Sequence, residues 1–195
     1  RLLCGILAGQ PFTVTMSGDP SIQKRPMGRV MKPLREMGAS IEGKNDNFCP
    51  LTLFPSELHG IEYRLPVASA QLKSAILLAG LYAEGQTTVI EPAPSRDHTE
   101  RMFRALGVEI ETNGSTITLD PPEDLHAVDI AVPGDISSAA FFLVAGTIVP
   151  GSELTIKNVG VNPTRTGVLD VLRDMGADIT ESNFRDEAEP MCDLT

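Results

Sequence analysis

One pattern of apolar and polar positions recurs three times along the chain. Apolar residues at helical spacing are followed by a glycine and then by alternating apolar and polar residues, as in residues 30–41. The separating glycines, Gly38, Gly107 and Gly176, lie 69 residues apart in both intervals. Self-similarity at a fixed period is typical of one supersecondary unit used repeatedly. Each repeat is therefore predicted to hold a helix that ends at glycine and then a half-buried strand.

The start and the apolar face of these helices can also be predicted. Pro26 suits a first helical turn, and Asp97 with Glu100 has the spacing of a capping box. The apolar positions are Val30, Leu34 and Met37 in the first repeat, Met102, Phe103 and Leu106 in the second, and Val168, Leu172 and Met175 in the third.

A second helix is expected in each repeat. Residues 69–83 and 137–146 begin with small residues, are apolar nearly all round, and precede a glycine and a β-rich run. Residues 2–8 with 13–15 resemble the remnant of a further copy. Helices that are apolar on all sides must be buried. The predicted fold class is α/β (α+β), with repeated βαβαββ units whose sheets surround buried helices.

Composition and charge exclude several classes of protein. The 195 residues are 42% apolar and 22% charged, which favours a globular fold over disorder. The net charge of −10 argues against a general binder of nucleic acid or of an anionic membrane. The longest apolar stretches, residues 75–83 and 139–150, are shorter than the roughly 18–20 residues of a membrane span. Scattered cysteines and histidines favour reduced thiols and a cytoplasmic location over a disulfide framework or a zinc site.

One segment of this acidic chain is basic. Its cationic side chains are Lys24, Arg25, Arg29, Lys32 and Arg35. Arg25 precedes Pro26 and thus an expected helix N-terminus, where backbone N–H groups, the helix dipole and a guanidinium favour a phosphate or carboxylate. A solvated helix face is the simpler explanation for Arg29, Lys32 and Arg35, and for Arg25 both explanations stay open.

Small hydroxyl residues stand at other expected helix starts. Ser69–Gln71, Ser95–Arg96 and Ser137–Ser138 could each hydrogen-bond a ligand or cap a helix, and capping is the commoner role. Repeated units can place several helix starts around one site, and a small polyanion would suit that site. The sequence shows no nucleophilic triad, metal-binding box or glycine-rich phosphate loop, and a first helical turn explains His98 better than an acid–base role does.

Several motifs, taken in series, resemble the 5-enolpyruvylshikimate-3-phosphate (EPSP) synthase family. They are residues 24–30 (KRPMGRV), 66–75 (PVASAQLKSA), 95–100 (SRDHTE) and 162–167 (NPTRTG). The likeness covers the whole chain and is greatest for the bacterial subgroup that includes glyphosate-tolerant members. It implies the enolpyruvyl transferase fold, in which each of two domains is an inside-out, barrel-like arrangement of three βαβαββ units. Residues 1–132 would be most of the N-terminal domain, and residues 133–195 the first unit of the C-terminal domain.

The resemblance also implies an activity. The family transfers the enolpyruvyl group of phosphoenolpyruvate to the 5-hydroxyl of shikimate 3-phosphate and releases phosphate, in the shikimate pathway of aromatic amino acid biosynthesis. The implied site residues are Arg25 and Gln71 for phosphoenolpyruvate, Ser69, Ala70, Gln71, Ser95 and Arg96 for shikimate 3-phosphate, and Arg1, Lys24 and Asp135 in support. No cofactor or metal is implied, glyphosate is an implied inhibitor, and the full-length protein would be a monomer that binds neither nucleic acid nor membrane.

Parts of the family pattern are absent from these residues. The N-terminal lysine-serine-arginine motif, the glycine-rich segment before Arg1 and the later acidic residues that transfer protons are not present, and the chain does not begin with Met. We therefore expect a piece of a longer protein that carries part of a substrate site and no catalytic residue.

Two alternatives remain open. UDP-N-acetylglucosamine enolpyruvyl transferase shares the architecture, but its reactive-loop cysteine has no convincing counterpart among Cys4, Cys49 and Cys192. A non-catalytic repeat module that binds a phosphorylated metabolite is also compatible with the composition and the repeat.

We predict that the 195-residue chain alone releases no phosphate from phosphoenolpyruvate in the presence of shikimate 3-phosphate, because the proton-transferring groups are missing. A phosphate-release assay on the purified chain, with the full-length protein as positive control, checks this. Turnover by the chain, free of host enzyme, would contradict it.

Overall fold

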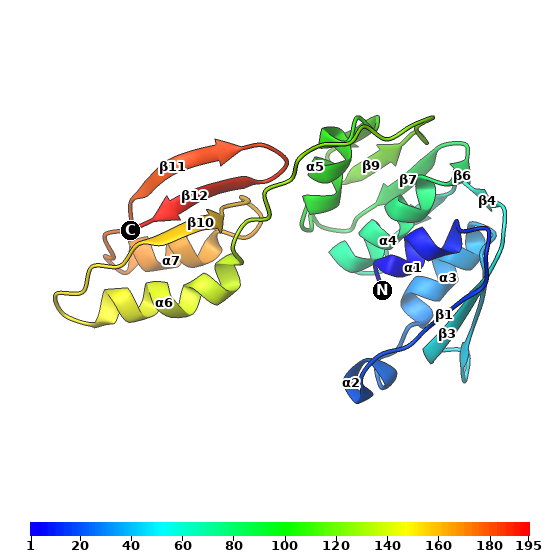
Figure 1. Ribbon diagram of the computed structural model, residues 1–195, viewed down its shortest axis with the longest axis horizontal. Coiled ribbons are helices and arrows are strands. Elements are labelled where there is room, and N and C mark those ends of the chain that lie inside the picture. Colours follow the sequence, from blue (N-terminus) through cyan, green and yellow to red (C-terminus); the bar gives the residue numbers. More distant parts are fainter. The chain divides into compact units, whose positions relative to one another are not determined.

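The computed structural model describes residues 1–195, and its internal contacts divide them into two units (Figure 1). The first unit comprises residues 1–95 and 107–126, and the second comprises residues 96–106 and 127–195. The helices are α1 (Leu3–Ala8), α2 (Pro20–Gln23), α3 (Gly28–Glu36), α4 (Ala70–Gly80), α5 (His98–Ala105), α6 (Ile136–Ile148) and α7 (Gly167–Asp174). The strands are β1 (Val14–Met16), β2 (Ser40–Lys44), β3 (Phe48–Phe54), β4 (Leu58–His59), β5 (Glu62–Arg64), β6 (Ala83–Glu84), β7 (Thr87–Ile90), β8 (Ile110–Asn113), β9 (Thr116–Leu119), β10 (Ile156–Gly160), β11 (Glu181–Asp186) and β12 (Pro190–Leu194).

The predicted repeat is present as three sheets of one topology. In the most complete copy the strand order is β5-β7-β9-β8, with β5 parallel to β7 and the other pairs antiparallel. The sheets β1-β3-β2 and β10-β12-β11 repeat the antiparallel part. In the last copy, an isolated parallel β-bridge between Gly134 and Val159 takes the place of the parallel pairing that β5 and β7 make in the complete copy. The predicted fold class, repeated βαβαββ units, is confirmed.

Each helix that precedes a hairpin ends as the glycine pattern predicts. Gly38, Gly107 and Gly176 have φ values of +100°, +82° and +94°, a region that favours glycine. In the first copy the Ala39 N–H donates to the Leu34 carbonyl at 2.9 Å, and residues 177 and 172 repeat this bond at 3.0 Å. These bonds satisfy helix carbonyls that have no partner within the helix.

Arg35 in α3 and Arg173 in α7 occupy equivalent positions of the repeat, and each joins its helix to the strand that follows. Arg35 Nη2 donates to the Ile41 carbonyl and to Asp46 Oδ1, both at 2.6 Å. Arg173 Nη2 donates to the Ile179 carbonyl at 3.3 Å and to Glu181 Oε1 at 2.7 Å. Arg35 is exposed, as expected for a solvated helix face, and its guanidinium also connects the helix to the hairpin.

The apolar helices predicted as the second helix of each repeat are α4 and α6. The first is buried, and the second is half-exposed. In the first unit α4 contacts α1, α3 and β7, and every residue from Leu72 to Gly80 is buried (Figure 1). In the second unit α6 buries one face, centred on Ile136, Ala139 and Leu143. Its other face is open, with Phe141 80% exposed, because no helix of residues 1–195 covers it. Burial of this helix on all sides was predicted and is wrong.

Two smaller expectations about helices also fail. Met175, placed on the apolar face of its helix, is 77% exposed, and Leu169 is buried instead. The Asp97 side chain does not cap α5, because its carboxylate accepts hydrogen bonds from Arg101 Nε at 2.9 Å and Asn162 Nδ2 at 2.7 Å. None of the helices has the length and apolar character needed to cross a membrane.

Two glycines of the first unit allow a matched stability test. Gly38→Ala and Gly85→Ala both force a side chain into left-handed backbone, at about 1–2 kcal/mol each. At Gly38 the new Cβ would also lie 2.7 Å from the Glu57 carbonyl oxygen, whereas nothing lies within 4 Å at Gly85. We expect Gly38→Ala to lower the free energy of unfolding by about 1–3 kcal/mol more than Gly85→Ala, measured by urea unfolding. Equal losses would contradict the close approach.

Candidate functional site

Arg1 joins two segments that the sequence proposed for one anion site. Its Nη1 donates to Gln71 Oε1 and its Nη2 donates to the Pro26 carbonyl oxygen, both at 3.0 Å. Gln71 lies in the first turn of α4, and Pro26 directly follows Arg25. The structure therefore brings the basic segment beside the start of α4.

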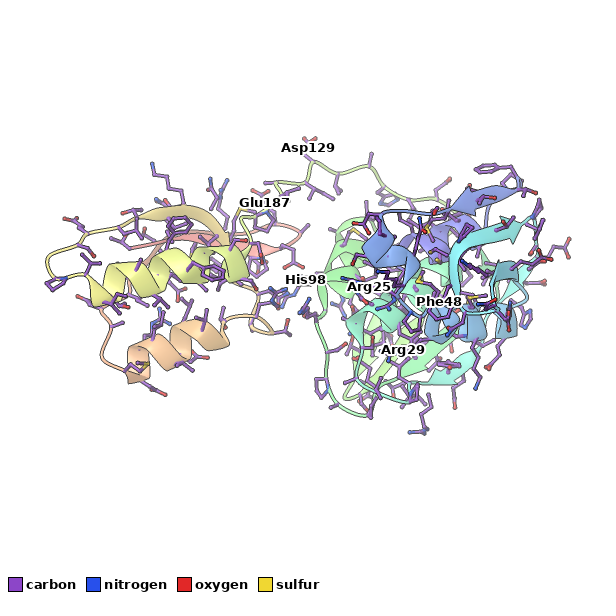
Figure 2. All side chains as sticks on the ribbon, turned by 90° about the horizontal axis from the view of Figure 1, so that it is seen from below. Arg25, Arg29, Phe48, His98, Asp129 and Glu187 are labelled. Carbon is purple, nitrogen blue, oxygen red and sulfur yellow. The ribbon has the colours of Figure 1, made fainter.

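Arg25 is exposed, and its guanidinium makes no hydrogen bond or ion pair (Figure 2). The helix start expected at Pro26 is displaced, because α3 begins at Gly28. Asn47 occupies that start: the N–H of Met27 donates to the Asn47 carbonyl at 2.6 Å, and the N–H of Gly28 donates to Asn47 Oδ1 at 2.8 Å. The helix-terminus argument for Arg25 is therefore wrong, and the free guanidinium is what remains to attract an anion.

The start of α4 has both an imperfect cap and free donors. Ser69 is half-buried, and its hydroxyl accepts a hydrogen bond from the Leu72 N–H at 3.4 Å, which is long for such a bond. The N–H groups of Ala70 and Gln71, in the first helical turn, have no acceptor within the helix. These donors and the positive end of the helix dipole favour a negatively charged ligand here.

A chain of three side chains, of which Lys73 and Glu91 are buried, connects α4 to Ser95. Lys73 and Glu91 are 1% and 5% exposed, and Lys73 Nζ donates to Glu91 Oε2 at 3.0 Å. The Ser95 hydroxyl donates to the other carboxylate oxygen, Glu91 Oε1. Sequence reasoning missed Lys73 and Glu91, although a lysine inside the apolar stretch 72–80 was a signal that a buried anionic partner must exist.

The remaining cations proposed for the site have no partners. The side chains of Lys24 and Arg96 are exposed and make no hydrogen bond or ion pair. Arg29, four residues after Arg25 and in the first turn of α3, is also exposed and unpaired, as expected for a solvated helix face (Figure 2). No partner side chain neutralises the charge of Lys24 or of Arg96.

In the second unit, Asp135 caps α6. Its carboxylate accepts from the N–H groups of Ser137 at 3.2 Å and Ser138 at 3.3 Å, so these serines belong to a capped helix start. Arg165 Nη2 lies 3.3 Å from Asp135 Oδ1 and donates to Ser137 Oγ at 2.6 Å. The hydrogen bond from the Ser137 N–H is the main influence that holds the pKa of the Asp135 carboxyl below its ordinary value.

The fold is of the enolpyruvyl transferase type, and comparison with known proteins identifies the family. The family model described as EPSP synthase (3-phosphoshikimate 1-carboxyvinyltransferase) matches residues 1–194. The chain is 61% identical over 197 residues to 3-phosphoshikimate 1-carboxyvinyltransferase of Geobacillus kaustophilus and 57% identical over 196 residues to that of a Thermoanaerobacter species. The whole chain aligns, but it covers 46% of each relative, so it spans about half their length.

A solved structure agrees with this assignment. EPSP synthase from Acinetobacter baumannii is 50% identical and superposes with a TM-score of 0.91 over 99% of this chain and 44% of that one. The chain belongs to the EPSP synthase family and has the enolpyruvyl transferase fold.

The Asp135 cap predicts a pH effect. Because the folded-state pKa lies below the ordinary 3.8, the cap contributes stability above that value and loses it as pH falls through the lower folded value. Asn caps a helix as Asp does but does not titrate in this range. Asp135→Asn should therefore lose less stability than the unchanged protein between about pH 5 and about pH 2.5, measured by urea unfolding followed by circular dichroism. Identical losses would contradict the cap's ionic contribution.

Proposed function

We propose that the full-length protein transfers the enolpyruvyl group of phosphoenolpyruvate to the 5-hydroxyl of shikimate 3-phosphate and releases phosphate. Residues 1–195 supply part of the substrate site. The family assignment supports this activity. The structural observation that carries it is the pair of Arg1 hydrogen bonds, which sets the Arg25 segment beside the start of α4.

Arg25 and Gln71 bind phosphoenolpyruvate in this proposal. A guanidinium can donate two parallel hydrogen bonds to a phosphate or carboxylate, so Arg25 would orient the anion as well as attract it. Its guanidinium needs to break no other contact to do so, because it has no partner in the structure. Arg1 holds the Gln71 amide oxygen, which leaves the amide NH₂ of Gln71 free to donate to a ligand.

Shikimate 3-phosphate would lie at the start of α4. Ser69, the backbone N–H of Ala70, and Gln71 offer donors to it there, and Ser95 with Arg96 adds a hydroxyl and a free cation. Lys24 supplies positive charge beside Arg25, and Asp135 helps to set closure between the domains.

The chemistry is addition followed by elimination through a tetrahedral intermediate. The groups that transfer protons would come from the remainder of the full-length protein, because no residue proposed here is an acid or base in contact with substrate. Holding both anions in one orientation is the contribution of residues 1–195, and orientation alone can supply a large part of a rate enhancement.

The proposal also covers the domain boundaries, the location and the inhibitor of the full-length protein. Residues 1–132 form most of the N-terminal domain and residues 133–195 the first unit of the C-terminal domain. The full-length protein acts as a cytoplasmic monomer and resembles the bacterial subgroup that includes glyphosate-tolerant members. Glyphosate is its proposed inhibitor.

Arg25→Ala in the full-length protein should lower kcat/KM for phosphoenolpyruvate by about 100-fold or more, because it removes charge-assisted hydrogen bonds worth about 1.5–3 kcal/mol each. Arg29→Ala is the matched control, since Arg29 is an exposed, unpaired arginine four residues further along the chain, and should change kcat/KM less than about threefold. Phosphate release is measured with shikimate 3-phosphate and, in parallel, with UDP-N-acetylglucosamine.

The two acceptors separate the possible activities. Release with shikimate 3-phosphate alone supports the proposal, and release with UDP-N-acetylglucosamine alone supports the related transferase. Release with neither acceptor, from a folded protein, would favour a module that only binds a phosphorylated metabolite. Equal losses in Arg25→Ala and Arg29→Ala would contradict the assignment of Arg25.

A further inference from the structure

We propose that Lys73 and Glu91 are positioning residues that hold Ser95 in place for shikimate 3-phosphate. This inference rests on the proposed function, because it uses Ser95 as a contact of that substrate. Lys73 and Glu91 are too deeply buried to meet a ligand themselves, at 1% and 5% exposure. Their effect would therefore pass through the side chain that they hold.

The carboxylate of Glu91 has one oxygen for each partner. Oε2 accepts from Lys73 Nζ at 3.0 Å, and Oε1 accepts from the Ser95 hydroxyl. A serine side chain can adopt three χ1 rotamers, which place its oxygen differently. The hydrogen bond to Glu91 Oε1 favours the rotamer that brings the Ser95 oxygen to this acceptor, and it also fixes the direction of the O–H.

The backbone N–H groups of Lys73 and Glu91 hold these two residues in place. The N–H of Lys73 donates to the Ser69 carbonyl at 3.0 Å, within the turn that begins α4. The N–H of Glu91 donates to the Ser115 carbonyl at 2.8 Å, which holds Glu91 on the β8–β9 turn. Pro92 and Pro94 restrict the backbone between Glu91 and Ser95. The chain thus fixes the distance between the start of α4 and Ser95, two places that would contact the same substrate.

A buried ion pair can also be merely structural, and two matched double variants separate these roles. Lys73→Met with Glu91→Gln and Lys73→Met with Glu91→Leu both remove the two charges and keep similar volumes. Replacing a buried pair by uncharged groups is often tolerated, whereas removing one partner leaves an unpaired charge. The two double variants differ in what position 91 offers to Ser95, since only Gln can still accept a hydrogen bond from the Ser95 hydroxyl.

The experiment uses the full-length protein and measures the Kd of shikimate 3-phosphate by calorimetry, KM and kcat by phosphate release, and folding by circular dichroism. We expect the Leu double variant to raise Kd and KM for shikimate 3-phosphate about fivefold, with kcat within about twofold, as for loss of one hydrogen bond. The Gln double variant should stay within about twofold of the unchanged protein. Adding Ser95→Ala to the Leu double variant should cause no further loss, because the positioning it would remove is already gone.

Glu36→Gln serves as a control for the Glu-to-Gln change, because Glu36 pairs with Lys32 at 4.0 Å on an exposed helix face. It should leave every parameter unchanged.

If the Leu double variant does not fold, Glu91→Asp provides the test. This variant keeps the buried charge but shortens the side chain, which moves the carboxylate away from Ser95. It should raise KM for shikimate 3-phosphate while the melting temperature stays near that of the unchanged protein.

The possible failures are distinguishable. If the unchanged protein neither binds shikimate 3-phosphate nor turns over, the proposed function fails. If it does both, and the Gln and Leu double variants bind equally well or equally poorly, the proposed function stands and the positioning role of Lys73 and Glu91 is wrong.

Discussion

The burial of α4 is the constraint on which the first unit depends. Nine consecutive residues, Leu72–Gly80, are buried, so the helix needs neighbours on every side, and α1, α3 and β7 provide them. Water is excluded along its length but reaches its first turn, where Gln71 is exposed. The unsatisfied N–H groups of a helix start need an acceptor. Burial of the rest of the helix thus leaves this end as the part that water, or the anion proposed above, can reach.

Lys73 is the one charged residue within this buried stretch of α4, and its burial requires the contact with Glu91. An unpaired ammonium would pay a large desolvation cost there, so it must have an anionic partner, and Glu91 supplies one. Because Glu91 follows β7 directly, the ion pair ties the sheet to the first turns of α4. The geometry between Ser69 and Ser95 is then set by buried contacts rather than by exposed loops.

Features that depend on local chemistry could be predicted from the sequence. The glycines at helix ends and the strands after them follow from short-range backbone preferences, and the 69-residue period shows that this unit recurs; the structure has all three features. Features that depend on distant partners could not. The start of α3 was misplaced because Asn47, nineteen residues after Gly28, occupies it. The exposed face of α6 was missed because an apolar pattern indicates what a helix would bury, and not whether a partner is present.

The residues of the candidate site could be predicted from the sequence, but their contacts with one another could not. Motifs single out Arg25, Ser69, Gln71 and Ser95, but only the structure shows that Arg1 links Gln71 to the Arg25 segment. The most direct test of this site is a crystal structure of the full-length protein with bound shikimate 3-phosphate. The ligand should lie within hydrogen-bond distance of Ser69 and of the Ala70 N–H, with Ser95 beside it. Shikimate 3-phosphate bound elsewhere, with the start of α4 still occupied only by water, would contradict the central claim that this helix end is the substrate site.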